Sequence, residues 1–179
     1  FSDHRITAGI WHRLLNLGFH VPAGAGTDAM TNYASLRGPN GLVRVFLDAP
    51  DRSPAALRAA LKQGRGVVTN GPQLGLEVEG ARPGQTVSKH KYKLNYRVAL
   101  RSPLAVDHLE LVYNGKVIQS FSLANNPRSV DASGEFEVKE GGWILLRAWA
   151  DNPDPLLLDL YPYATTNPVW LPIPAPPAP

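Results

Sequence analysis

The pattern of apolar and polar positions changes character near residue 72. Before that point, apolar residues recur at helical spacing in two stretches, which alternate with short continuous apolar runs. After it, apolar and polar residues alternate, as is typical of strands with one buried face. We therefore expect an α+β protein with a small N-terminal α/β unit over residues 1–72, an antiparallel β-sandwich over 73–172 and a proline-rich tail over 173–179.

An amphipathic helix is predicted over residues 6–17, with Thr7 as its N-cap and Gly18 directly after its end. Trp11 and Leu15 widen its apolar face. That face is defined by four residues at helical spacing: Ile6, Ile10, Leu14 and Leu17.

Three short apolar runs, over residues 19–26, 42–47 and 67–69, predict strands. The last two are separated by a helix that begins after Ser53 and ends at Gly64. This order of helices and strands favours a parallel or mixed α/β layer.

The C-terminal part shows its clearest half-buried strand over residues 92–100. Asn114-Gly115 between two apolar runs predicts a tight hairpin, because both turn positions need positive φ. The run 143–150 is apolar on both faces, which predicts a central strand. About seven short strands over this length are the signature of an immunoglobulin-like or fibronectin-like sandwich.

Composition narrows the possible functions. The 179 residues carry a net charge of +3 from scattered Lys and Arg, so we expect no nucleic-acid partner. The chain contains no cysteine, which excludes disulfides, thiol catalysis and Cys-ligated metals. No run of about 18 apolar residues exists, so we expect no membrane span. The compartment, cytoplasmic or extracytoplasmic, stays open.

The most suggestive position for chemistry is Asp28, which follows the predicted strand 19–26 and the two glycines Gly24 and Gly26. A carboxylate at the end of a strand is well placed to hold a metal ion or to activate water. The alternative is an ordinary turn residue, because Asp readily bonds its own backbone in loops. Spacing alone favours the turn.

The five histidines do not form an HxH, HxxxH or HExxH pattern, so spacing defines no metal motif. A structural or solvated role is the favoured interpretation for each of them: His4, His12, His20, His90 and His108. His4 could still reach the same rim as Asp28 if the sheet curls. Five aromatic residues could form a sugar platform, although packing between sheets is the favoured role: Trp143, Trp149, Tyr161, Tyr163 and Trp170.

Three parts of the chain resemble one family. The first is Gly9–Phe19 followed by Ala25–Met30, the second is Gly64–Pro72, and the third is Thr166–Leu171. In this order they resemble PHP-superfamily metallohydrolases, closest to the CehA/McbA-like branch that is related to carbaryl hydrolase. The resemblance implies the end of a PHP-type barrel followed by an accessory sandwich. It also implies hydrolysis of a small-molecule phosphoester, ester or carbamate with divalent metals (zinc, manganese or iron) held by His and Asp.

The family's last motif is Asp-x-His at a strand end. Asp28 matches its Asp, whereas Met30 stands where the His would be, and Met is a poor ligand for a hard divalent ion. The remaining ligands would lie upstream of Phe1. We therefore expect a C-terminal fragment that is not active alone and that self-associates through apolar surface exposed over residues 6–70. The alternatives are a non-catalytic binding or structural sandwich module and a degenerate, inactive homologue.

Overall fold

The computed structural model describes residues 3–29, 40–88 and 91–173 of the chain. Within these ranges two helices and ten strands follow one another along the sequence. In chain order they are α1 (His4–Asn16), β1 (Arg44–Leu47), α2 (Pro54–Lys62), β2 (Gly66–Thr69), β3 (Gln73–Val78), β4 (Lys93–Arg101), β5 (His108–Tyr113), β6 (Lys116–Ser120), β7 (Ser129–Glu137), β8 (Gly142–Trp149), β9 (Tyr163–Thr166) and β10 (Val169–Leu171).

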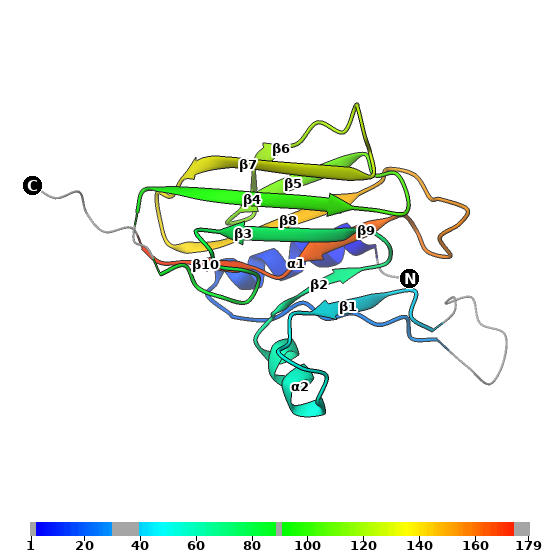
Figure 1. Cartoon of the computed structure of the whole chain (residues 1–179), viewed down its shortest axis with the longest axis horizontal. Coiled ribbons are helices and arrows are strands. Elements are labelled where there is room, and N and C mark those ends of the chain that lie inside the picture. Colours follow the sequence, from blue (N-terminus) through cyan, green and yellow to red (C-terminus); the bar gives the residue numbers. More distant parts are fainter. Residues whose placement is uncertain (1–2, 30–39, 89–90, 174–179) are drawn as a thin grey trace, which may run out of the picture.

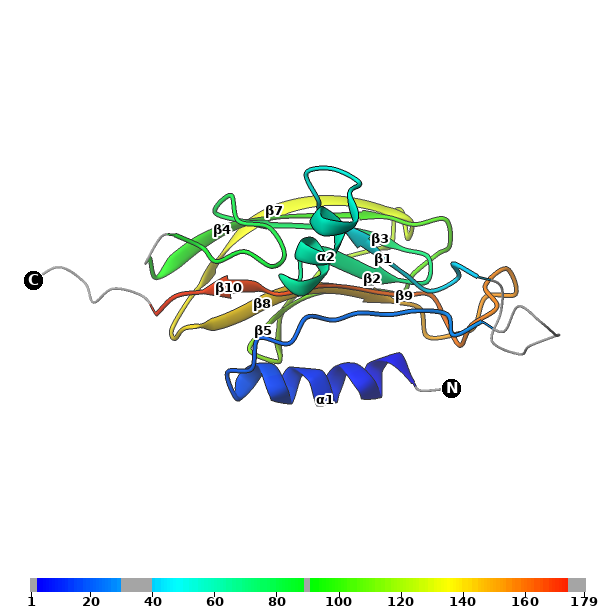
Figure 2. The same cartoon turned by 90° about the horizontal axis from the view of Figure 1, so that it is seen from below.

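Two sheets and one helix form three layers. The larger sheet has the order β1-β2-β9-β8-β5-β6, with β10 also paired to β8, and the smaller sheet has the order β3-β4-β7 (Figure 1). The two sheets pack face to face, and α1 lies on the outer face of the larger one (Figure 2). The chain is therefore a mixed α+β protein built on a two-sheet sandwich.

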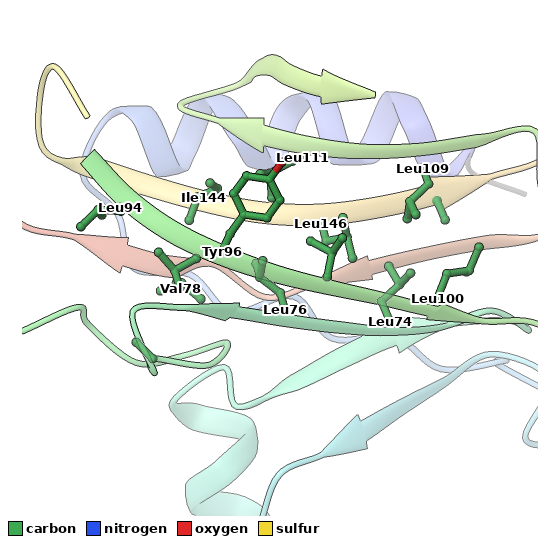
Figure 3. Close-up of a cluster of buried hydrophobic side chains, with 14 of the residues drawn as sticks. Leu74, Leu76, Val78, Leu94, Tyr96, Leu100, Leu109, Leu111, Ile144 and Leu146 are labelled. Carbon is green, nitrogen blue, oxygen red and sulfur yellow. The ribbon is translucent and has the colours of Figure 1, made fainter. Parts of the chain in front are cut away.

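The main core fills the space between the two sheets (Figure 3). Alternate residues of β3 and β4 point into it, among them Leu76 and Leu100. Strand β8 contributes Ile144 and Leu146 from the opposite sheet. The alternation along β3 and β4 was predicted from the sequence, and the structure confirms it.

Strand β8 is buried on both faces. Its even-numbered residues face the smaller sheet, whereas Trp143 and Leu145 pack with Leu15 of α1. This confirms the central strand predicted over 143–150. The predicted hairpin is also confirmed, because Asn114 and Gly115 join β5 to β6 with φ of 48° and 83°.

Several features of the N-terminal segment differ from expectation. Residues 19–26 form no strand, and this segment is mostly exposed rather than buried. The expected parallel or mixed layer is also wrong, because β1 pairs antiparallel with β2, and β2 pairs antiparallel with β9. A short apolar run becomes a strand only where a neighbouring strand can pair with it. Here β9, which the sequence reading missed, takes the place beside β2.

Helix α1 packs on the larger sheet through a face that lies opposite the predicted apolar stripe. Ala8, His12 and Leu15 are its buried residues, and they face the larger sheet. The predicted four-residue stripe is exposed, at 68% for Ile6, 59% for Ile10, 38% for Leu14 and 74% for Leu17. The predicted apolar face exists, but the described part of the chain does not cover it.

The ends of the helices follow known capping rules. Asp3 caps α1 in place of the predicted Thr7, and its Oδ1 accepts hydrogen bonds from the backbone N–H groups of Arg5 and Ile6. Ser53 caps α2 as predicted, and its Oγ accepts from the N–H of Ala56 at 3.2 Å. Across the described ranges, neither helix has the length and hydropathy that crossing a membrane requires.

Candidate functional site

Residues 19–29 form a segment, the strap, that runs beside α1 (Figure 2). The indole Nε1 of Trp11 donates a hydrogen bond to the carbonyl oxygen of Val21 at 2.7 Å. Two residues further on, the side chain of Asn167 accepts from the backbone N–H of Ala23 at 2.7 Å. The side chains of Trp11 and Asn167 therefore form hydrogen bonds with backbone groups of the strap. In a sheet, a neighbouring strand would pair with these groups.

The far end of the strap is fixed by Thr27. Its Oγ1 accepts a hydrogen bond from the N–H of Val43 at 3.0 Å and donates to the carbonyl oxygen of the same residue at 3.3 Å. Asp28 follows directly, is exposed, and has a φ of 55°. This left-handed conformation is one that Asp adopts more readily than most residues. Asp28 thus has the backbone conformation of an exposed loop residue.

A cavity of about 510 Å³ lies between the strap, α1 and the strands β2 and β9. Its size is within the range of small-molecule sites. It is lined by residues from the first two stretches that carry the family resemblance and by Thr165, which directly precedes the third, and the strap contributes Gly24 and Gly26. The lining is His4, Thr7, Ala8, Trp11, Pro22–Gly26, Val43, Val68–Asn70, Tyr163 and Thr165.

Asn70 organises one end of this cavity. Its Oδ1 accepts from the backbone N–H of Tyr163 at 2.7 Å, and its Nδ2 donates to Asp159 and to the carbonyl oxygen of Tyr161, each at 2.8 Å. The Nε2 of His4 lies 3.2 Å from the same Asp159 carboxylate. The asparagine therefore joins β2, β9 and the loop before β9 and, through Asp159, holds His4 at the cavity.

Tyr163 forms the aromatic wall of the cavity. Its ring stacks with that of His4, with the ring centroids 5.3 Å apart. Burial, partly offset by the positive charge of Arg147, raises the pKa of the Tyr163 hydroxyl to about 12. The hydroxyl is consequently protonated at neutral pH and cannot serve as a base there.

The structure does not bring Asp28 together with other metal ligands. In residues 3–29, 40–88 and 91–173, no group of three or more His, Asp or Glu side chains is arranged to hold a metal ion. Asp28 is also not among the cavity-lining residues, although the strap that carries it is. Met30 lies outside the described residues. The described residues therefore do not form a metal centre by themselves, and we derive no chemical step through one.

His12 is the most deeply buried of the described histidines, at 7% exposure. Its ring centroid lies 4.9 Å from that of Trp143, and its Nε2 has no hydrogen-bond partner among the described residues. Burial, reinforced by the nearby Arg147 charge, lowers the pKa of His12 to about 4. His12 is therefore a neutral residue on the buried face of α1, which agrees with the structural role favoured from the sequence.

Two more histidines pack against tryptophans. His20 stacks on Trp170 with the ring centroids 3.7 Å apart, and His108 stacks on Trp149 at 4.4 Å. His108 also lies 2.8 Å from the carboxylate of Asp151. His90 lies outside the described residues.

The predicted packing of the aromatic residues between the two sheets is wrong for three of them, which are buried on the outer face of the larger sheet, where α1 lies. Trp143, Trp149 and Tyr163 are only 1%, 4% and 6% exposed, so they cannot form an open sugar platform. Arg147 lies over the Trp149 ring at 4.9 Å and donates to Glu110 at 2.7 Å. This arginine is thus held between an aromatic ring and a carboxylate.

Sequence reasoning missed the two asparagines that position the site. Asn70 and Asn167 both lie in stretches quoted for the family resemblance, where an Asn precedes Gly-Pro or Pro. Both asparagines are nevertheless at most 3% exposed, because their side-chain amides form hydrogen bonds with backbone groups of other segments. That burial is visible only in three dimensions.

Comparisons of the chain with protein-family models, with curated proteins and with solved structures find no match.

Proposed function

We propose that this chain is the C-terminal part of a PHP-type metal-dependent hydrolase and that it builds one wall of the active site. The observation that carries the proposal is that residues from two of the resembling stretches, Trp11 and Asn167, hold the strap by hydrogen bonds. Asn70, from the third stretch, shapes the adjoining cavity. The bond between Asn167 and Ala23 joins positions 144 apart in the sequence, and it fixes the strap that carries Asp28.

In this proposal the chain's own contribution is positioning. Thr27 fixes the end of the strap, so the carboxylate of Asp28 is presented from a restrained backbone. The other ligands of a zinc, manganese or iron centre would come from outside the described residues. The substrate would be a small-molecule phosphoester, ester or carbamate. The barrel-derived nature of the N-terminal segment and the immunoglobulin-like class of the sandwich belong to the same proposal.

The exposed stripe of α1 supports the idea that this surface is covered in a larger protein. A surface helix normally turns its widest apolar face to the core, yet Ile6, Ile10 and Leu17 are each more than half exposed. Phe19 on the adjoining strap is 56% exposed as well. We propose that barrel elements cover this surface in the whole hydrolase, and that copies of the isolated chain associate through it.

Hydrolysis assays on a longer protein that contains this chain test the proposal. We expect turnover of aryl phosphates or aryl carbamates, and a loss of at least about a hundredfold in Asp28→Asn. The matched control is Glu137→Gln on β7, an exposed carboxylate on the other sheet, which should keep full activity. A folded longer protein without turnover of either ester class would favour the degenerate homologue instead.

A further inference from the structure

A second groove is lined by no residue of the strap. It has a volume of about 770 Å³ and occupies the corner between β1 and the outer face of the smaller sheet. A second hollow of about 440 Å³ continues along the same face and shares Glu77, Arg97 and Ser133 with the first. Together they form an elongated depression across β3, β4 and β7, which we call the corner groove.

The floor of the corner groove is made of small residues. Gly75 of β3 lies directly opposite Ala99 of β4, and Ala99 lies opposite Asp131 of β7. A Cβ added to Gly75 would lie 3.4 Å from the Cβ of Ala99, which is close contact. The two small residues therefore leave backbone and methyl surface accessible where larger side chains would fill the groove.

One wall of the corner groove is apolar. Phe46 is 44% exposed and projects from the edge strand β1 beside Leu47. The guanidinium of Arg44 lies 6.0 Å from the Phe46 ring centroid, so the ring has a cationic neighbour along the strand and still exposes much of its surface. An exposed aromatic ring beside a small-residue floor suits a ligand with a flat, apolar C–H face.

The charged side chains that line the corner groove are mostly acidic: Asp48, Glu77, Glu79, Asp131 and Glu135 against Arg82 and Arg97. Glu77 and Arg97 are cross-strand neighbours, which places a carboxylate and a guanidinium side by side along the groove. Two of these carboxylates form ion pairs, because Asp131 accepts from Arg101 at 2.7 Å and Asp48 lies 3.8 Å from Arg82. The excess of carboxylates disfavours an anionic ligand, and carboxylates beside a guanidinium suit a neutral ligand whose hydroxyl groups both donate and accept.

We propose that the corner groove binds a short neutral oligosaccharide. A sugar chain presents C–H faces to Phe46 and the small floor, and its hydroxyls both donate to Glu77 and accept from Arg97. The elongated shape over two joined hollows fits a linear chain of sugar rings. This site is separate from the strap and does not depend on the proposed hydrolase function.

Titration of the full 179-residue chain with four neutral disaccharides tests the proposal: cellobiose, maltose, xylobiose and chitobiose. Calorimetry gives the affinity, and amide chemical shifts give the location. We expect at least one disaccharide to bind and to shift the amides of Gly75 and Ala99. Phe46→Ala should weaken binding about tenfold or more, and Ala99→Leu, which fills the floor, should abolish it.

The matched control is Tyr92→Ala, because Tyr92 is an aromatic residue of similar exposure, 46%, that does not line the groove. Its affinity should stay within about twofold of the unmodified chain. Near-ultraviolet circular dichroism checks that each variant is folded. If Phe46→Ala does not fold, the affinity of Ala99→Leu decides the test.

Three results would overturn the proposal. The first is that none of the four sugars shifts the groove amides. The second is that folded Phe46→Ala or Ala99→Leu binds as well as the unmodified chain. The third is that an extended peptide shifts the amides of β1 while the sugars do not, because the edge strand would then be the binding element. A failed hydrolysis assay has no bearing on these outcomes, since binding is measured without turnover.

Discussion

The carboxamide of Asn167 makes two hydrogen bonds to one residue, Ala23. Its Oδ1 accepts from the backbone N–H at 2.7 Å, and its Nδ2 donates to the carbonyl oxygen at 3.3 Å. This pairing reproduces what a neighbouring strand would offer an extended segment. A single side chain beside β9 therefore holds the middle of the strap.

Asn167→Ala should release the strap. We expect the free energy of unfolding to fall by about 1–3 kcal/mol, because a buried amide pair is lost and the Ala23 groups lose their partner. Denaturant unfolding measures the loss, and hydrogen exchange at the Ala23 amide localises it. Asn126→Ala, whose side chain accepts only from the nearby Arg128 N–H in an exposed turn, is the control. Unchanged protection of Ala23 in Asn167→Ala would refute the anchoring role.

Gly84 packs closely against the backbone of residues 63–65, which follow α2. It has a φ of 83°, and an added Cβ would lie 2.4 Å from the carbonyl oxygen of Gln63. Gly80 has a similar φ of 86° but has open space around it. We expect Gly80→Ala to cost about 1–2 kcal/mol of stability from the backbone conformation alone. Gly84→Ala should cost clearly more, and equal losses in thermal unfolding would show that the contact with Gln63 is unimportant.

His12 should make the protein sensitive to mild acid. Its folded-state pKa of about 4 lies below the ordinary value of 6.5, so between these values the unfolded chain binds more protons than the folded one. Stability from this group is therefore fully present above pH 6.5 and is lost as the pH falls toward 4, by up to about 3 kcal/mol.

Denaturant unfolding measured from pH 7 to pH 4 checks this, with Trp143 fluorescence reporting on the contact under α1. His12→Leu and His12→Gln, which carry no titrating group at this position, should both flatten this part of the profile. An unchanged slope in both variants would assign the acid sensitivity to other groups.

The exposed stripe of α1 should drive association of the isolated chain. Replacing Ile6 and Ile10 by Glu places charges on the two residues near its N-terminal end, which are 68% and 59% exposed. In sedimentation velocity this double variant should be monomeric at concentrations where the unmodified chain associates. Val117→Glu, on the edge strand β6 and 44% exposed, is the control and should leave association unchanged. Association that persists in the α1 variant would place the contact elsewhere.

Much of the sandwich could be predicted from the sequence because burial in an antiparallel sheet is local. Leu74 and Leu76 alternate with exposed residues in the chain itself, and the Asn114-Gly115 turn needs no distant partner. The pattern on α1 predicted an apolar face correctly but could not say which face meets the sheet. Ala8, His12 and Leu15 turned out to be the buried residues, and Leu15 packs on Trp143 and Leu145 of β8.

The candidate site was harder to predict because its geometry depends on distant residues. The anchoring of Ala23 by Asn167 spans 144 positions, and the link from Asn70 to Tyr163 spans 93. Neither contact leaves a periodic signal in the sequence. Asp28 was singled out from its motif, but its exposed, left-handed backbone was not, because that conformation leaves no periodic signal in the sequence.

The central claim is that the strap presents Asp28 to a divalent metal in a larger hydrolase. The most direct measurement is the metal content of a longer protein that contains this chain, purified without chelators and compared with its Asp28→Ala variant. The account predicts bound zinc, manganese or iron in the unmodified protein, and a clear loss of metal in Asp28→Ala with the fold retained. A folded longer protein that holds no divalent metal, or one whose metal content is the same with and without Asp28, would contradict it.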